Sequence, residues 1–178
     1  MARTKRTRRR IRRTGKWSSN IQELNNVIIA TDPGQWSATT TLATNPTQNV
    51  LGVSNIYTVK NFDINFTIES ANSLDAANSL EAITAYIMFV PQGMIIDENY
   101  NLNHPEYILN YKYLGSPPGT SAAGAEIQQF QPFRLRSRLS RKLQTGDSVV
   151  LFLKGTNSSS ANVNVFLSGL IRWWTKAN

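Results

Sequence analysis

Alternation of apolar and polar residues is the clearest pattern along this chain, and it is strongest at positions 57–69. A period of two places one face of a strand in a core and the other face outside it. The apolar positions of this expected strand are Phe62, Ile64, Phe66 and Ile68. Segments 82–90 and 148–154 are apolar on both faces and end at turn residues, so we expect them to be central strands.

The rest of the chain consists of short stretches rich in β-branched and aromatic residues, separated by Gly, Pro, Asn and Ser clusters. Two segments have helical character: 71–81, which is rich in Ala, and the turn that begins at His104 and Pro105, since Pro is favourable at the first helical position. Residues 115–124 are predicted to form a surface loop. The remaining strands are expected at 24–30, within 37–44, at 108–114, at 133–139 and at 162–174.

About eight strands with long connections predict an all-β fold, and the leading candidate is an eight-stranded jelly-roll β-sandwich. The immunoglobulin sandwich is the alternative, but it is usually smaller and its characteristic Cys pair is absent here. We assign residues 1–20 to a disordered Arg-rich arm and residues 21–178 to a single jelly-roll domain.

Positive charge is concentrated at the N-terminus. The chain has 19 Lys and Arg and 11 Asp and Glu, and nine of the basic residues lie in the first 16 positions, where no acidic residue occurs. The other 162 residues therefore carry ten basic and 11 acidic side chains, which divides the chain into an arm of +9 and a body of −1. Such an arm cannot bury enough apolar surface to fold alone. Its basic residues are Arg3, Lys5, Arg6, Arg8, Arg9, Arg10, Arg12, Arg13 and Lys16.

An arm of this kind is expected to bind single-stranded nucleic acid, because neutralising phosphates requires a high density of positive charge but no fixed geometry. If all nine charges engage one strand, log K should fall with log[salt] at a slope of roughly −6. A solubility or targeting tail without a binding role is the alternative. Residues 5–13 also predict nuclear localisation. Trp17, where the arm meets the body, either stacks on a base or anchors the arm to a domain.

A second basic cluster lies inside the body. Arg134, Arg136 and Arg138 alternate with other residues, so they share one face of the expected strand, and Arg141 and Lys142 follow. We hypothesise that this stripe continues the phosphate-binding surface of the arm. The alternative is a solvated sheet face whose arginines pair with carboxylates such as those of Glu69 or Asp63.

Several aromatic residues are candidates for contacts between subunits. Trp173 and Trp174 end the last expected strand, so one should face the core and the other an interface or the surface. Tyr107, Tyr111 and Tyr113 are compatible with core packing or with an aromatic interface.

Catalytic chemistry has few candidates in this chain. His104 is the only His and there is no Cys, so neither a zinc site nor a nucleophile with its base is expected, and we predict no enzyme activity, no cofactor and no metal. His104 is interpreted as a solvated loop or capping residue. Asp97 and Glu98 are interpreted as an exposed acidic turn, with a calcium contact shared between subunits as the alternative. No apolar run is long enough to cross a membrane, and the N-terminus lacks the pattern of a secretory signal.

Four stretches together resemble a known family. They are the Arg-rich start 3–16, the strand and turn AYIMFVPQG at 85–93, the segment HPEYILNYKYLG at 104–115 and the run RLSRKLQTGDSV at 138–149. Their order and spacing are similar to those of the jelly-roll capsid proteins of small viruses with circular single-stranded DNA, the circovirus-like group that encodes a replication initiator. This chain is shorter than circovirus capsid proteins.

The resemblance implies a structural protein of the virion that assembles into an icosahedral shell of roughly 60 copies (T=1), with the arms directed inward onto single-stranded DNA. The basic arm predicts that the protein enters the host nucleus during assembly, with a nuclear import receptor and a cell-surface receptor as further expected partners. A coat protein of a small satellite-type RNA virus, or a non-viral nucleic-acid-binding β-domain with a basic tail, stays open as an alternative.

Overall fold

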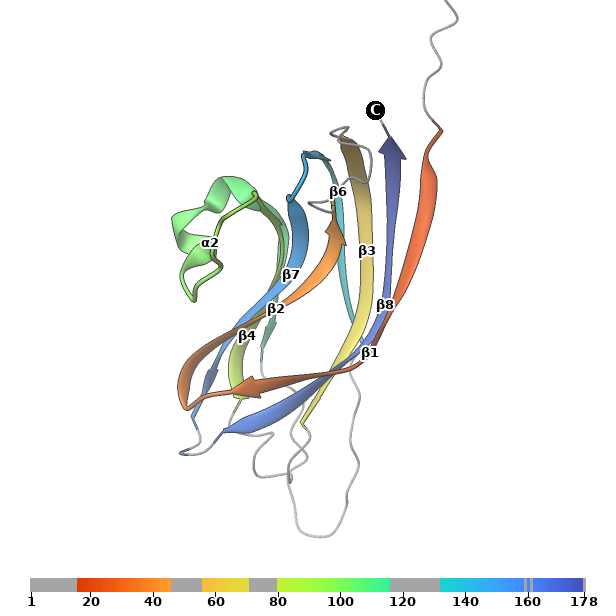
Figure 1. Ribbon diagram of the computed structural model, residues 1–178. Coiled ribbons are helices and arrows are strands. Elements are labelled where there is room, and N and C mark those ends of the chain that lie inside the picture. Colours follow the sequence, from red (N-terminus) through yellow and green to blue (C-terminus); the bar gives the residue numbers. More distant parts are fainter. Residues whose placement is uncertain are drawn as a thin grey trace, which may run out of the picture.

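Eight strands form two four-stranded antiparallel sheets in the computed structural model of the chain (Figure 1). The structure describes residues 16–45, 56–70, 80–115, 132–158, 160 and 162–177. The strands are β1 (Ser18–Thr31), β2 (Gly34–Thr44), β3 (Tyr57–Ser70), β4 (Leu80–Val90), β5 (Ile108–Gly115), β6 (Phe133–Leu143), β7 (Ser148–Asn157) and β8 (Val163–Ala177).

The strand order identifies the fold as a jelly roll. One sheet has the order β1-β8-β3-β6 and the other the order β2-β7-β4-β5, so in each sheet the strands alternate between the first four and the last four of the chain. This arrangement of two Greek keys across two sheets confirms the predicted jelly-roll sandwich. Figure 1 shows the two curved sheets facing each other, with the short helix α2 (Tyr100–Asn103) and its loop beside the second sheet.

The space between the sheets holds the main core, and the period-two pattern explains which side chains enter it. Phe62, Ile64, Phe66 and Ile68 all point inward and are buried, as the alternation predicts. A second, smaller cluster lies on the outer side of the other sheet. It contains Met88, Val90, Tyr100, Val150 and Phe152, and α2 and the 3-10 helix η1 (Pro105–Tyr107) adjoin it.

Strand boundaries differ from the sequence-based expectations mainly at their ends. β1 begins at Ser18, inside the range 1–20 assigned to the arm, and extends beyond the expected 24–30. The helical segment expected at 71–81 lies outside the described residues up to position 79, and its last two residues, Leu80 and Glu81, belong to β4 instead. They pair there with Asn157 and Thr156 of β7, whose backbone hydrogen bonds extend the strand. The helical turn expected at Pro105 is present as η1.

A buried carboxylate fastens one end of the sandwich. The Asp147 Oδ1 and Oδ2 atoms accept hydrogen bonds from the backbone N–H groups of Gln92 at 3.0 Å and Gln144 at 2.8 Å. The Asp147 carbonyl accepts from the N–H of Asn45 at 2.9 Å, and the Asn45 side chain donates to Leu143 O at 3.0 Å. The ends of β2 and β4 are therefore tied to the turn between β6 and β7.

Replacing Asp147 with Ala is expected to lower the free energy of unfolding by about 2 kcal/mol, because the N–H groups of two part-buried hydrogen bonds lose their acceptor. Urea denaturation followed by circular dichroism measures the change. Glu98→Ala is the control, since this exposed carboxylate should contribute within about 0.5 kcal/mol. Equal stability of the two variants would contradict the role assigned to Asp147.

Candidate nucleic-acid interface

The outer face of the β1-β8-β3-β6 sheet gathers basic side chains from three strands. Ile64 lies opposite Leu135 of β6 and Ile171 of β8, and all three are buried, so the residues next to them along each strand point outward. Among the residues of this face whose side chains are described, two are acidic, Glu23 and Asp63. Its seven basic residues, called the basic face below, are Lys60, Arg134, Arg136, Arg138, Lys142, Arg172 and Lys176.

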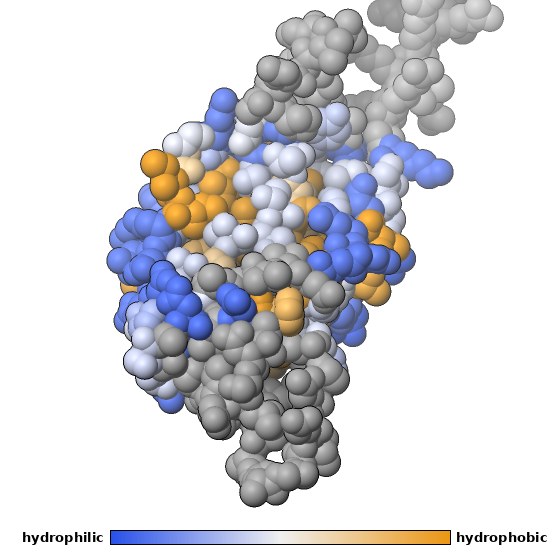
Figure 2. All heavy atoms as spheres, turned by 60° about the horizontal axis from the view of Figure 1, so that its bottom comes forward, coloured by the Kyte–Doolittle hydropathy of each residue, from blue (hydrophilic) through white to orange (hydrophobic). Residues whose placement is uncertain are grey.

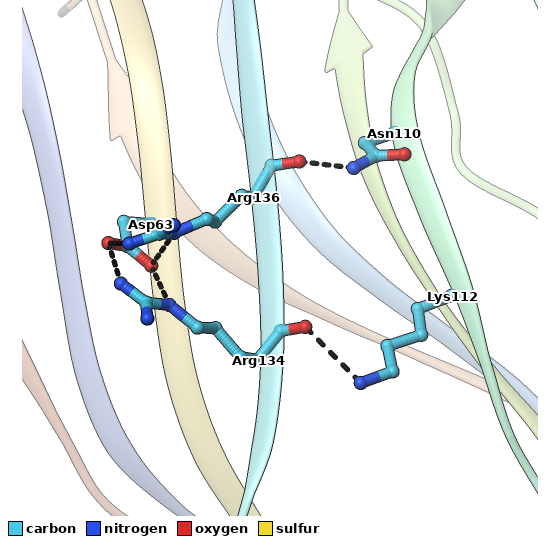
Figure 3. Close-up of polar contacts among 5 residues, drawn as sticks. All are labelled: Asp63, Asn110, Lys112, Arg134 and Arg136. Atoms are coloured by element: carbon cyan, nitrogen blue, oxygen red, sulfur yellow. Dashed lines mark hydrogen bonds and ion pairs between the residues drawn. The ribbon is translucent and has the colours of Figure 1, made fainter.

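Two arginines of the basic face share a single carboxylate (Figure 3). Arg134 Nε and Nη2 donate to the Asp63 oxygens at 2.9 and 2.8 Å, and Arg136 Nε and Nη2 donate to the same oxygens at 3.1 and 3.2 Å. The pairing with Asp63 that the sequence offered as an alternative is therefore present. One carboxylate neutralises only one of two guanidinium groups, and the arginine side chains remain 50% and 57% exposed.

The backbone that carries these arginines is fixed by the edge strand of the other sheet. Asn110 Nδ2 donates to the Arg136 carbonyl, and Lys112 Nζ lies 3.5 Å from the Arg134 carbonyl (Figure 3). In return, Ser137 Oγ donates to Leu109 O at 3.1 Å. These contacts cover the open edge of β6 and leave the arginine side chains on the far side, over β3.

The root of the N-terminal arm lies on this same face. Lys60 Nζ of β3 is 3.8 Å from the centroid of the Trp17 ring, although Trp17 precedes β1 and β8 lies between β1 and β3. The Trp17 ring therefore reaches across the outer side of the sheet. The structure brings the ring against its own domain, beside Lys60. The eight more distal basic residues of the arm, from Arg3 to Arg13, lie outside the described residues, and Lys16 is exposed.

Trp173 and Trp174 point to opposite faces of the sheet, as their adjacent positions in the strand predict. Trp173 packs against the main core, whereas Trp174 points outward and lies 5.3 Å from the Arg172 guanidinium. Lys142 joins the basic face, opposite Thr58. Arg141 does not, because it lies opposite the buried Val59 and its Nη2 atom donates to the Glu106 carbonyl at 2.9 Å.

The outer face of the second sheet has a different composition. In the described part of its four strands, Lys154 is the one basic residue that points outward, and its Nζ atom donates to Glu98 O at 2.9 Å. Aromatic residues gather here instead. Tyr86 stacks on Tyr111 at 5.9 Å, and Tyr111 is 63% exposed, whereas Tyr107 is half-buried against Phe89.

Figure 2 views the molecule from the lower end of Figure 1. Apolar and hydrophilic side chains lie interspersed there. In the parts of the chain that the structure places, no helix is long and apolar enough to span a membrane.

The titratable residues of the loop before β5 form a small packed cluster. The His104 ring stacks on Tyr107 at 5.3 Å, and its Nδ1 atom is 3.4 Å from Glu106 Oε1. Burial, together with the nearby Tyr107 and Glu106, raises the pKa of Tyr100 to about 12. Asp97 and Glu98 lie in an exposed turn, as expected. Within the described ranges, no three His, Cys, Asp or Glu residues come together in a way that could hold a metal ion.

Comparisons with known proteins give no family. No family model matches the chain, and no curated protein matches it. The similar solved structures include an infectious bursal disease virus VP2 subviral particle, with a TM-score of 0.32 and 10% identity over 91% of this chain and 41% of that chain. T=1 particles derived from infectious bursal virus have a TM-score of 0.27 and 8% identity over 91% of this chain and 39% of that chain. This chain thus spans about two-fifths of their length, and the likeness is too distant to carry an argument. The fold class, a jelly roll, rests on the strand order.

Three members of the basic face were not identified from sequence: Lys60, Arg172 and Lys176. Each is an isolated basic residue in its own segment. The alternation of apolar and polar residues could have predicted that Lys60 and Arg172 point away from the core, because each lies on the polar face of a strand whose other face is apolar. Which strands become neighbours could not be read from that signal.

Proposed function

We propose that this protein is the coat protein of a small virus, a structural subunit that assembles into an icosahedral shell and packages single-stranded DNA. One observation carries the proposal. The arm root at Trp17 lies on the sheet face with seven basic residues, whereas the opposite outer face has one among the described residues. A subunit with nucleic acid on one side and a surface almost free of basic groups on the other fits a shell wall.

The charge distribution supports packaging rather than sequence recognition. A tail of nine positive charges binds phosphates without reading bases. In a shell of roughly 60 copies, such arms would supply roughly 540 positive charges, enough to offset much of a genome of a few kilobases or less. The body, with a formal charge of −1, lets subunits approach one another without strong repulsion. The sequence resemblance favours DNA over RNA, and residues 5–13 would direct the protein to the host nucleus.

The test of this proposal is assembly. Purified protein should give uniform closed particles by sedimentation and negative-stain microscopy, and a raised 260/280 absorbance ratio if nucleic acid is inside. Subunits that stay monomeric across salt and pH would contradict the shell and favour a regulatory nucleic-acid binder. Competition between single-stranded DNA and RNA of equal length then separates the DNA-virus assignment from a satellite-type RNA coat protein.

Replacing Arg134, Arg136 and Arg138 together with Gln is expected to make the salt dependence of nucleic-acid binding shallower by about 2 units of slope, since each phosphate contact contributes about 0.7. Fluorescence anisotropy of a labelled single strand over a range of NaCl concentrations measures this slope. Lys154→Gln, on the outer face of the opposite sheet, is the control and should leave the slope unchanged. An unchanged slope in the triple variant would mean that these three arginines do not contact phosphates.

A further inference from the structure

We propose that Trp17 and Trp174, together with Lys60 and Arg172, form a base-stacking site for single-stranded nucleic acid on the basic face; this site deepens the proposed function and rests on it. The four side chains come from three parts of the chain that the fold brings together. Lys60 lies directly opposite Trp174 in the pairing of β3 with β8, and its Nζ atom is 3.8 Å from the centroid of the Trp17 ring. The Arg172 guanidinium is 5.3 Å from the centroid of the Trp174 ring.

The site lies beside the shared-carboxylate cluster. Arg172 is directly opposite Asp63, which in turn lies opposite Arg136, so one row across the sheet reads Arg172, Asp63, Arg136. Trp174 is two residues farther along β8, which places it about 7 Å from this row. A nucleotide whose base stacks on Trp174 can therefore keep its phosphate beside the guanidinium groups. Because this row has two guanidinium groups and one carboxylate, it retains a net positive charge for the phosphate.

Exposed apolar surface on the same face favours bases as the occupant. Ile21 lies opposite Arg172 and is 65% exposed, and Leu170, two residues before Arg172, is 51% exposed. Apolar and cationic groups alternate here, which suits a ligand that presents flat bases as well as phosphates. Proteins that bind single strands without sequence preference combine a positive track with aromatic rings, because every base has a face that can stack. The basic arm, which starts at this site, would deliver the strand to it.

The experiment must separate base stacking from the electrostatic contacts of the arm. These contacts weaken steeply with salt, whereas stacking releases no counterions. Binding of the full-length chain to an oligo(dT) strand, measured by anisotropy and extrapolated to 1 M NaCl, therefore isolates the contribution of the two rings. Trp17→Leu and Trp174→Leu should each weaken binding at 1 M NaCl by about five- to 100-fold and leave the salt slope unchanged. Tyr113→Leu, which removes an exposed aromatic ring from the opposite sheet, is the control and should have no effect.

Two further variants keep the test decisive if a Leu variant folds poorly. Trp174→Phe should retain most of the wild-type affinity at 1 M NaCl, since a smaller ring still stacks. Lys60→Gln should reduce affinity and make the slope shallower by about 0.7. Wild-type affinity at 1 M NaCl in the folded Trp variants would overturn the stacking site. The stacking site would also be overturned if Trp174→Leu prevented particle formation while its free subunits bound oligo(dT) normally, because Trp174 would then be a subunit contact. Failure of the wild-type chain to form particles would instead refute the shell and leave the stacking measurement valid.

Discussion

Removal of residues 2–16 is expected to abolish retention of nucleic acid while the body of the chain still folds. The deleted segment contains nine basic residues and no acidic one, and the body left behind has ten basic and 11 acidic side chains. The first buried core residue among those with a described side chain is Leu24, so every described core residue lies outside the deleted segment. The particle fraction should lose its excess absorbance at 260 nm, and circular dichroism should still report a folded β-protein.

The size of the effect follows from the number of charges. Nine phosphate contacts at about 0.7 each correspond to a slope of roughly −6, which the deletion should remove, leaving only the contribution of the basic face. A second variant, with the same nine residues changed to Gln, keeps the length of the arm and should behave like the deletion. If the Gln variant still packaged nucleic acid while the deletion did not, the length of the arm rather than its charge would be responsible. An insoluble, unfolded deletion would contradict the separation of arm from body.

Replacing Gly169 with Ala is expected to cause the largest loss of stability among the substitutions considered. Gly169 lies in β8 opposite Phe66 of β3, and a Cβ atom at this position would be 2.1 Å from Asn65 O and 2.6 Å from Phe66 Cα. These are backbone atoms of a central strand pair, so they cannot move aside without opening the β3–β8 ladder. We expect the free energy of unfolding to fall by about 3 kcal/mol, at the upper end of the usual cost of overpacking.

The neighbouring substitution Leu170→Ala provides the control for Gly169→Ala. Leu170 is half-exposed on the outer face, and shortening it should cost less than about 1 kcal/mol. Urea denaturation of the two variants measures the difference. A Gly169→Ala protein as stable as the control would show that β3 and β8 are not held as closely as this register requires.

The basic face explains how one domain can serve two kinds of contact. Seven basic residues and the arm root lie on the outer side of one sheet. On the outer side of the other sheet, Lys154 is the one basic residue among those described, and its amine donates a hydrogen bond to the Glu98 carbonyl. The core lies between the two faces, so under the proposed function each surface can meet a different partner. The variants at Arg134, Arg136 and Arg138, and the control at Lys154, test this division directly.

The fold was predictable because its main determinant is local. The inward residues of β3, from Phe62 to Ile68, alternate in the sequence itself, and burying one face of each such strand requires a sandwich. The start of β1 was not predictable. Residues 18–23 show no alternation and expose Ile21, and they are extended because their backbone groups pair with β8, at the opposite end of the sequence. No local preference encodes such a pairing.

By itself, the sequence determined the positively charged arm, most of the strands and the arginine stripe at 134–138, since each depends on residues close together in the chain. The number of strands and the length of their connections favoured a jelly roll. Only the tertiary structure decided which other residues lie beside that stripe. Asp63 lies 71 residues from Arg134 in sequence, and the pairing of β3 with β6 brings them into contact. The pairing of β3 with β8 adds Arg172 and Trp174 to the same face. Which distant strands become neighbours is set by how two whole sheets bury their apolar faces together.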